Sequence, residues 1–390
     1  MNISIYGHGG SANHGNEAIV RGVSKLLNDY NITLYSFMPE NDKKFELNKV
    51  CEIKPHGRIH KRYTLEHIIL SLLFRLSKGK MPFYKYWVMP LLKNINGIYL
   101  LEAGDQYCEN GFQRKLYSYL NKKITNRGGK TVMLGCTVNE EYLEDKKVLE
   151  DLSRYSLIVA RESITYDALR KAGITKNTVL APCPAFAMES EKCELPEIFT
   201  NDVVGINVGF LSQNNEKYYD LLVKNCEKLI GYILNKTNYS IALIPHVNWN
   251  PDLSDFKTLN LLYEKYKTSD RIGVVNEHSA PRQKYIMSKC RFMIALRTHV
   301  CVPSIAAQVP TLVTGYKVKS TGIVRDIFPE DYKLLAHLQS LKTEDDFTQH
   351  FIWMQENETK IREYMKEHIP DYIEKTHIIR DEITKLISGK

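Results

Sequence analysis

Residues 292–307 read FMIALRTHVCVPSIAA, and this stretch indicates the fold of the chain. The apolar run 292–296 predicts a buried strand, and the apolar segment 300–307 predicts a helix that follows it at once. Arg297 and His299 stand between the two, at the carboxyl edge where open parallel α/β sheets bind ligands. A helix start adds free N–H groups, and histidine titrates near neutral pH. The stretch therefore predicts a site for an anion beside a proton donor.

The same alternation of short apolar runs and helical patterns extends along the whole chain. In the first half, strands are expected at 3–6, 32–37, 98–101, 131–135, 157–160 and 178–181, with helices at 17–27, 114–126, 140–153 and 162–172. In the second half, strands are expected at 203–208, 241–244, 272–275, 292–296 and 311–313, with helices near 216–234, 254–267, 281–289 and 300–308. These patterns predict an α/β fold with two Rossmann-like domains facing a cleft.

The length of 390 residues also favours two domains, because one hydrophobic core stops growing at roughly 250–300 residues. We expect an N-terminal domain over 1–185 and a C-terminal domain over 200–340. Residues 182–196, rich in Pro, Cys and Glu, break the alternation and indicate the interdomain linker. The charged helical pattern of 341–390 predicts helices that pack across both domains.

The start of the chain lacks a basic n-region and a long apolar h-region. No later stretch approaches the roughly 20 apolar residues of a spanning helix, so a cytoplasmic protein is expected. Eight cysteines are scattered without Cys-x-x-Cys or Cys/His spacing, which favours reduced thiols over a zinc site. No Asp-x-Asp pair occurs either, and we therefore expect no metal.

The net charge of +8 is concentrated in one segment. Residues 54–93 hold nine Lys or Arg and a single acid, Glu66, among many aliphatic and aromatic residues. Such a segment fits an interfacial element on an anionic membrane, at the inner face. A pair of helices packed on the domain with a solvated basic rim fits equally well. Nucleic acid is not expected as a partner, because the aromatic residues cluster with aliphatic ones instead of alternating with bases.

A loop with four glycines follows the first strand and opens the first helix, over residues 7–18. Glycines let the backbone approach a ligand, and Asn13, Asn16 and Glu17 carry hydrogen-bonding groups suited to sugar hydroxyls. The spacing is neither Gly-x-Gly-x-x-Gly nor a Walker A loop, which disfavours a dinucleotide or ATP. Asn16 fits a helix cap as well as a sugar ligand.

Further polar residues stand at other strand ends. Asp105 and Tyr107 follow the strand at 98–101, and a carboxylate with an aromatic face is a common means of holding a sugar, although a surface turn has the same pattern. Arg161 follows the strand at 157–160, in the other domain from Arg297. His246 follows the strand at 241–244, where it lines the cleft or only fixes its loop.

Lys317 and Lys319 follow the last expected strand and reach the same edge of the sheet. Together with Arg161, Arg297 and His299, they predict a metal-free site for a small, multiply charged anion. Arginines at strand ends are also common as surface ion-pair partners. The prediction therefore depends on their convergence at one place.

Three segments together resemble the polysaccharide pyruvyl transferases. They are the Asn-x-Gly-Asp-Glu-Ala-like loop at 13–18, the Arg-x-Ser helix start at 161–163, and the Arg-x-His strand end that leads to a Tyr and Lys segment at 297–319. The resemblance covers roughly residues 3–325. Asn16 stands where the family usually has Asp, and 102–105 read EAGD where the family usually has a glycine run. Both departures lie in the half expected to hold the acceptor.

The resemblance implies a GT-B-like fold and a transferase that uses phosphoenolpyruvate as co-substrate, without a cofactor. The product would be a cyclic pyruvate ketal on a sugar of a polysaccharide or lipid-linked oligosaccharide, with release of phosphate. Arg161, Arg297 and Lys319 would hold the donor, with Lys317 as the competing lysine. His299 would protonate C3 of the enol, although the direction of its pKa shift does not follow from the sequence.

The acceptor sugar would lie against residues that follow other strands: Asn13, Asn16, Glu17, Asp105, Tyr107 and His246. Two other functions fit the same pattern. One is a GT-B glycosyltransferase with a nucleotide-sugar donor, for which Glu277 or Asp326 would supply the ribose-binding carboxylate. The other is a non-catalytic sugar- or lipid-binding module.

Overall fold

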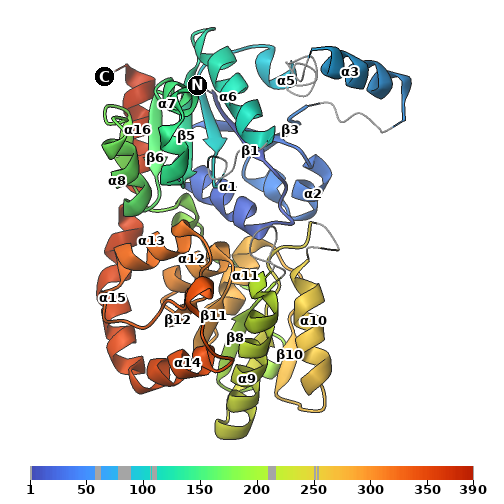
Figure 1. Ribbon diagram of the computed structural model, residues 1–390, viewed down its shortest axis with the longest axis vertical. Helices are drawn as coiled ribbons and strands as arrows, with labels where there is room; N and C mark the ends of the chain where they lie inside the picture. Colours follow the sequence, from blue (N-terminus) through green and yellow to red (C-terminus); the bar gives the residue numbers. More distant parts are fainter. Residues whose placement is uncertain are drawn as a thin grey trace.

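The computed structural model describes residues 2–57, 63–77, 89–105, 107, 112–209, 217–249, 252 and 254–389. Its strands form two parallel sheets, one above the other in Figure 1, and helices flank each sheet. Two Rossmann-like halves with this arrangement constitute a GT-B-like α/β fold, as the sequence predicts.

The first sheet has the order β3-β2-β1-β4-β5-β6-β7. Its strands are β1 (Asn2–His8), β2 (Asn31–Ser36), β3 (Glu52–Pro55), β4 (Ile98–Glu102), β5 (Lys130–Cys136), β6 (Leu157–Ala160) and β7 (Thr178–Leu180). The second sheet has the order β10-β9-β8-β11-β12. Its strands are β8 (Val203–Asn207), β9 (Ser240–Leu243), β10 (Ile272–Val274), β11 (Phe292–Ala295) and β12 (Thr311–Val313).

The helices connect successive strands and extend beyond the last one. In the first half they are α1 (His14–Leu26), α2 (Pro39–Lys44), α3 (Leu65–Leu76), α5 (Met89–Leu92), α6 (Phe112–Thr125), α7 (Lys146–Leu152) and α8 (Ser163–Lys171). In the second half they are α9 (Tyr219–Lys236), α10 (Asp255–Tyr266), α11 (Ala280–Met287), α12 (Thr298–Ala306) and α13 (Val318–Ile327). The tail forms α14 (Asp346–Glu356), α15 (Glu358–Glu374) and α16 (His377–Ser388).

The central strands are buried along their whole length. β4, β8 and β11 read IYLLE, VVGIN and FMIA, and every one of these residues is buried. Continuous apolar runs of this kind are expected in parallel strands that helices cover on both faces. Within β8, a Cβ at Gly205 would lie 2.1 Å from the Met293 sulfur of the neighbouring β11, so a larger residue would displace this methionine side chain.

In each sheet the strand order reverses at one strand, β1 in the first and β8 in the second. β1 pairs with β2 on one side and β4 on the other, while β8 pairs with β9 and β11. The connections leave these strands in opposite directions and open a crevice beyond their carboxyl ends, which is where ligands bind in open α/β sheets. The fold therefore places the ends of β1 and β4 at the first crevice and the ends of β8 and β11 at the second.

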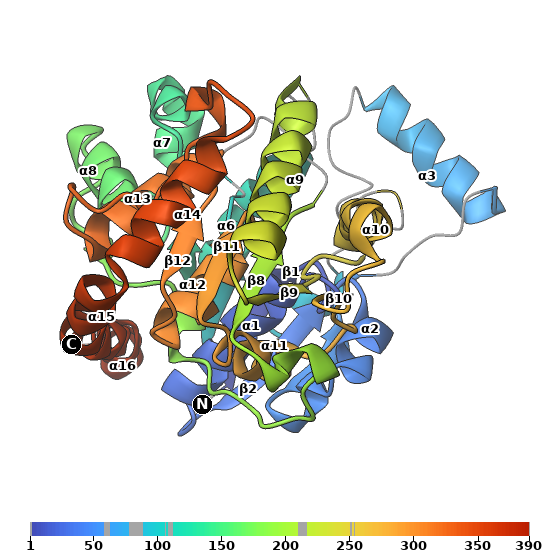
Figure 2. The same ribbon diagram turned by 90° about the horizontal axis from the view of Figure 1, so that it is seen from below.

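The two halves are joined by close packing at α1. The short 3₁₀ helix at Pro184–Ala187 is buried in the connection between the halves and contacts α1, α12 and α15. A Cβ at Gly22 of α1 would lie 2.0 Å from the carbonyl oxygen of Pro184. In the tail, α14 contacts α9, α15 contacts α12 and α13, and α16 returns to α1. Figures 1 and 2 show α15 and α16 along one side of the molecule.

Several elements differ from the sequence predictions. β3 was not predicted, because Glu52–Pro55 contains a single large apolar residue and lies at the sheet edge. The helix expected at 140–153 is a 3₁₀ turn at Glu140–Glu144 followed by α7, since Asp145 caps a new helix by accepting a hydrogen bond from the Lys147 amide. α13 was also missed, and its N-cap is Lys317.

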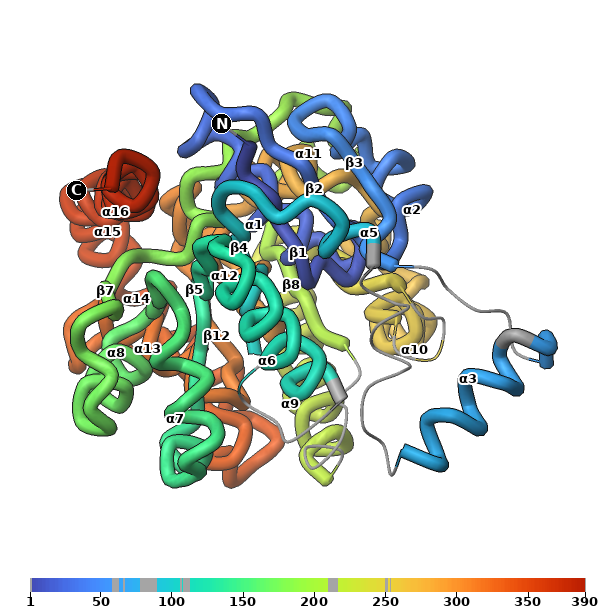
Figure 3. Tube along the Cα trace, turned by 90° about the horizontal axis from the view of Figure 1, so that it is seen from above, coloured from blue at the N-terminus to red at the C-terminus, as the bar shows by residue number. Residues whose placement is uncertain are grey.

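Helix α3 stands apart from the rest of the molecule, as Figures 1 and 3 show. Residues 58–62 and 78–88 of the basic segment predicted at 54–93 lie outside the described residues. Within the described part of the chain, no helix has the length and apolar character needed to cross a bilayer.

Because Gly22 of α1 contacts Pro184 and Gly231 of α9 has no close neighbour, alanine substitutions at these two positions should change stability in opposite directions. Gly22→Ala should destabilise the protein by about 1–3 kcal/mol, because the added methyl group overlaps a backbone carbonyl. Gly231→Ala on α9 is the matched control, where the nearest atom lies 3.9 Å from the new Cβ. It should stabilise by up to about 1 kcal/mol through helix propensity. Urea unfolding measures both changes, and equal effects would contradict the packing argument.

Candidate active site

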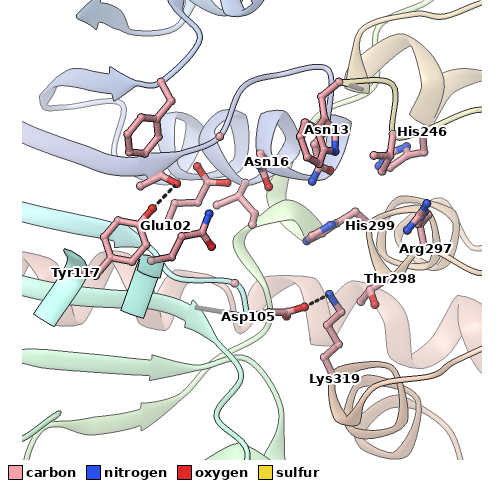
Figure 4. Close-up of a pocket in the computed structure, with 18 of the residues that line it drawn as sticks. Asn13, Asn16, Glu102, Asp105, Tyr117, His246, Arg297, Thr298, His299 and Lys319 are labelled. Carbon is pink, nitrogen blue, oxygen red and sulfur yellow. Dashed lines mark hydrogen bonds and ion pairs between the residues drawn. The ribbon is translucent and has the colours of Figure 1, made fainter. Parts of the chain in front are cut away.

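A cavity of about 400 Å³ lies at the carboxyl ends of the strands, between the two halves. Its walls come from the segments that follow β1 and β4 in the first sheet and β9, β11 and β12 in the second. Figure 4 shows side chains from both halves around this space. The cavity thus joins the two crevices that the strand order creates.

Arg297 is the N-cap of α12 and lines the cavity. Its Nε and one terminal nitrogen donate to Asp255 Oδ1 at 3.1 and 2.8 Å. Asp255 is fully buried, and its other oxygen accepts hydrogen bonds at 3.0 Å from the backbone N–H groups of His246 and Val247. Burial lowers the pKa of the guanidinium, but Asp255 more than offsets this and raises it. Arg297 is therefore a fixed cation with an imposed orientation.

His299 lies in the first turn of α12 and packs against α1 of the other half. A Cβ at Gly15 would be only 2.0 Å from its Nδ1, so glycine is needed there. Its buried Nε2 has no hydrogen-bond partner among the described residues. Burial, with Lys319 and Arg161 nearby, lowers its pKa to about 3, although Asp105 acts in the opposite direction. The imidazole is consequently neutral at pH 7 in this structure.

Three cations converge on the carboxylate of Asp105, which follows β4. Arg161 donates to Oδ1 at 2.8 Å, while Lys319 and Lys317 donate to Oδ2 at 2.8 and 3.1 Å. The Arg161 side chain is buried and also donates through Nε to Thr137 at 2.9 Å. Burial alone would raise the pKa of Asp105, but the three cations hold it well below its ordinary value. Figure 4 shows Asp105 and Lys319 at the edge of the cavity.

The cavity wall opposite this cluster carries neutral polar groups. Asn13 and Asn16 both line it, and Asn13 caps α1 by accepting a hydrogen bond from the Gly15 amide at 3.2 Å. His246 lines it too, with Nδ1 donating to Gln283 Oε1 at 2.8 Å. Burial lowers the pKa of His246 well below its ordinary value, and its Nε2 has no partner among the residues described. His246 is therefore held by Gln283 of α11 and lines the cavity.

Glu17 and Tyr107 lie away from the cavity, contrary to the expectation that both contact a sugar. Glu17 is fully buried, where it accepts hydrogen bonds from the Ala280 amide and from Arg21, so it joins the two halves. Tyr107 is also buried, and its hydroxyl donates to Asp151 at 2.5 Å in the core of the first half. Both side chains point into the protein interior and not toward the cavity.

The sequence profile of the polysaccharide pyruvyl transferase family matches residues 13–318. The chain belongs to this family. The matched region includes Asn13, Asp105, Arg161, Arg297 and His299, and it ends one residue before Lys319.

Solved structures of other transferases and epimerases share the fold. HepE from Anabaena, in complex with UDP-glucose, superposes with a TM-score of 0.61 at 13% identity over all of both chains. UDP-GlcNAc 2-epimerase from Neisseria meningitidis, bound to UDP-GlcNAc, gives 0.60 at 12% identity over 100% of this chain and 99% of that one. A glycosyltransferase from Rickettsia africae gives 0.53 at 13% identity over 98% of each. No curated protein matches this chain in sequence.

Sequence reasoning missed several residues of this site. Asp255 orients Arg297, and the only local signal was its place at a helix start after Ser254. Glu102 lines the cavity at the end of β4, where a charged residue closing the apolar run IYLL was a usable signal. His8 binds Glu102 from the end of β1. A histidine directly after an apolar strand carries the same kind of signal as His299.

The environment of His299 predicts how its titration changes when a neighbour is removed. In the wild type we expect no titration of this imidazole between pH 5 and 8, because its pKa is lowered to about 3. Lys319→Met removes a positive neighbour, so the midpoint should move upward, toward the ordinary value of about 6.5. NMR of labelled imidazoles, assigned with His299→Ala, measures the shift. An unchanged or lower midpoint in Lys319→Met would contradict the electrostatic assignment.

Proposed function

We propose that this transferase moves the enolpyruvyl group of phosphoenolpyruvate onto two hydroxyls of one sugar, forming a cyclic pyruvate ketal and releasing phosphate. The acceptor sugar belongs to a polysaccharide or a lipid-linked oligosaccharide precursor. Membership of the family supports the transfer of a pyruvyl group. The identity of the donor rests on the charges around the cavity.

The observation that carries the proposal is the convergence of Arg161, Lys317 and Lys319 on a single carboxylate. With Asp105 ionised, this cluster has two positive charges in excess, and Arg297 lies at the same cavity. A donor with a phosphate and a carboxylate supplies the matching negative charge. Cations held by burial and ion pairs also stabilise phosphate as it leaves, without reorganising.

His299 is the proton donor to C3 of the enol in this scheme. It is neutral in the structure, because burial and Lys319 lower its pKa to about 3. The negative charges of the donor raise that pKa, so the imidazole takes up a proton as the donor binds. Transfer to C3 makes the methyl group and leaves an oxocarbenium-like C2, which a sugar hydroxyl attacks. The C2–O bond to phosphate then breaks, and the second hydroxyl closes the ketal.

The proposal predicts the loss of phosphate release in two variants. His299→Ala should lower turnover about 100- to 10,000-fold, because general acid catalysis contributes that much. Arg297→Lys should also be strongly impaired, since a lysine cannot reproduce the two-nitrogen contact with Asp255. The measurement is release of inorganic phosphate from phosphoenolpyruvate with β-galactosides, N-acetylhexosamines and lipid-linked glycans as acceptors.

His377→Ala on α16 serves as the control, because this histidine is half-exposed and belongs to the tail. It should leave turnover unchanged. Near-normal rates in either active-site variant would remove its residue from the proposed chemistry. Binding of phosphoenolpyruvate by the wild type without phosphate release would favour the non-catalytic binding module instead.

A nucleotide-sugar donor remains the alternative within this fold, and it has less support from the residues. The carboxylates expected to hold a ribose are engaged elsewhere. Asp326 accepts a hydrogen bond from the Ser163 amide at 2.7 Å, across the two halves. Glu277 accepts from Asn248 at 2.9 Å and from Lys44 at 3.0 Å. Calorimetric binding of a UDP-sugar, with no phosphate release from phosphoenolpyruvate, would support the glycosyltransferase.

We also propose that the protein binds the inner face of a membrane peripherally, through α3. Six apolar side chains of this helix have exposed fractions from 42 to 74%: Leu65, Ile68, Ile69, Leu72, Leu73 and Leu76. An apolar surface of this kind within a basic segment suits an anionic bilayer, where the apolar face inserts and the cations bind headgroups.

The membrane proposal predicts that removing the apolar side chains of α3 abolishes vesicle binding. A variant with Leu65, Ile69, Leu72 and Leu76 changed to Ser should no longer co-sediment with vesicles that contain phosphatidylglycerol. Leu261→Ser is the matched control, because this leucine of α10 is similarly exposed, at 52%. It should sediment like the wild type.

A second arm of the same assay tests the electrostatic contribution. Reversing Lys78, Lys80 and Lys85 to Glu should weaken co-sedimentation, and high salt should do the same to the wild type. Equal sedimentation of the wild type, the α3 variant and the charge-reversed variant would refute membrane binding by this segment.

A further inference from the structure

A buried row of ionisable side chains ends in the wall of the cavity, on the side of the first sheet. His8, at the end of β1, donates from Nδ1 to Glu102 at 2.7 Å and from Nε2 to Asp42 at 2.9 Å. His8 and Asp42 are fully buried, and Glu102 is only 4% exposed. Among the three, Glu102 is the one that lines the cavity. Figure 4 shows it on the opposite side from His299.

The far end of this row is fixed to the backbone. Asp42 Oδ1 accepts hydrogen bonds at 2.8 Å from both the amide and the hydroxyl of Ser11, in the glycine-rich loop after β1. Burial lowers the pKa of His8, but the two carboxylates overcome this and raise it to about 10. His8 is therefore an imidazolium at neutral pH, and both of its ring nitrogens donate. The Glu102 carboxylate is held in one orientation by this contact.

The two carboxylates of the cavity have opposite environments. Burial raises the pKa of Glu102, with Asp42 acting in the same direction and His8 against it. The pKa of Asp105 is held well below its ordinary value, because three cations surround it. A carboxylate in that state is a weak base, whereas one with a raised pKa accepts protons readily. Carboxyl groups whose environments separate their pKa values in this way commonly divide acid, base and charge-stabilising roles.

We propose that Glu102 is the general base that takes the proton from the attacking sugar hydroxyl, with His8 and Asp42 as its positioning residues. This inference rests on the proposed pyruvyl transfer and assigns its acceptor step. A second group is needed because His299 donates its proton to C3.

This assignment accounts for every proton that moves in the reaction. The first hydroxyl forms its bond to C2 and passes its proton to Glu102, while His299 gives one proton to C3. The bond from C2 to the phosphate oxygen then breaks. As the second hydroxyl closes the ketal, its proton and the one on Glu102 are released: one restores His299 and the other leaves with phosphate. Two hydroxyl protons thus end as one C–H bond and one proton on the products.

Glu102→Gln tests the base directly, because the amide keeps the shape of the side chain and an oxygen for the His8 N–H. Turnover with phosphoenolpyruvate and the best acceptor should fall at least about 100-fold, while phosphoenolpyruvate binding measured by calorimetry stays within about threefold of wild type. The control is Glu52→Gln, an exposed carboxylate on β3, which should leave both quantities unchanged. Turnover within about threefold of wild type in Glu102→Gln would overturn the inference.

The pH dependence distinguishes positioning from a structural role. In the wild type, kcat/KM should rise with pH through the pKa of Glu102, and this limb should be absent in Glu102→Gln. His8→Asn removes a cation that lowers the Glu102 pKa, so the limb should move to higher pH. Asp42→Asn removes an anion that raises it, and the limb should move to lower pH.

Shifts of the limb in the same direction in both variants, or no shift in either, would overturn the roles of His8 and Asp42. Failure of the proposed function has a different signature, because the wild type would then release no phosphate with any acceptor. That result would remove the donor assignment and the base assignment together. An active wild type beside an equally active Glu102→Gln would remove only the base.

Discussion

The contact between Asp105 and its three cations determines the geometry of the cavity. Arg161 comes from the first sheet, while Lys317 and Lys319 come from the second, and one carboxylate holds all three at 2.8–3.1 Å. Like charges at this separation would repel strongly in a partly buried site, so the carboxylate between them is required for the cluster to form. The relative position of the two sheets and the charge of the site thus depend on the same interaction.

The parts of the fold that were predictable are those with local signals. Parallel strands buried on both faces read as continuous apolar runs, and each was found within a few residues of its place, as in 203–208 for β8 and 292–296 for β11. β3 lies at the edge, carries little apolar character and was missed. A helix boundary that depends on one side chain, such as the Asp145 cap of α7, also leaves only a weak signal in the sequence.

The site residues that could be predicted are those whose place is set by following directly after a strand. Arg297 and His299 line the cavity because β11 ends at its edge. The partners of Asp105 could not be inferred, because Lys319 is 214 residues away in sequence. We expected Asp105 to contact a sugar, whereas its carboxylate is occupied by the cations. The expected sugar contact of Glu17 is absent for a related reason, because this carboxylate accepts a hydrogen bond from the Ala280 amide of the other half.

The contact between Gly15 and His299 has a consequence for hinge motion. The imidazole belongs to one half and the glycine to the other, so any opening of the cleft hydrates the ring and removes Arg161 from its surroundings. Hydration and the loss of Arg161 raise its proton affinity, and the loss of Asp105, which belongs to the same half as Arg161, lowers it by less. By thermodynamic linkage, a proton favours the conformation to which it binds more tightly. The hydrogen ion therefore acts as a ligand of the open form. Acidification and hinge opening are then two expressions of a single equilibrium.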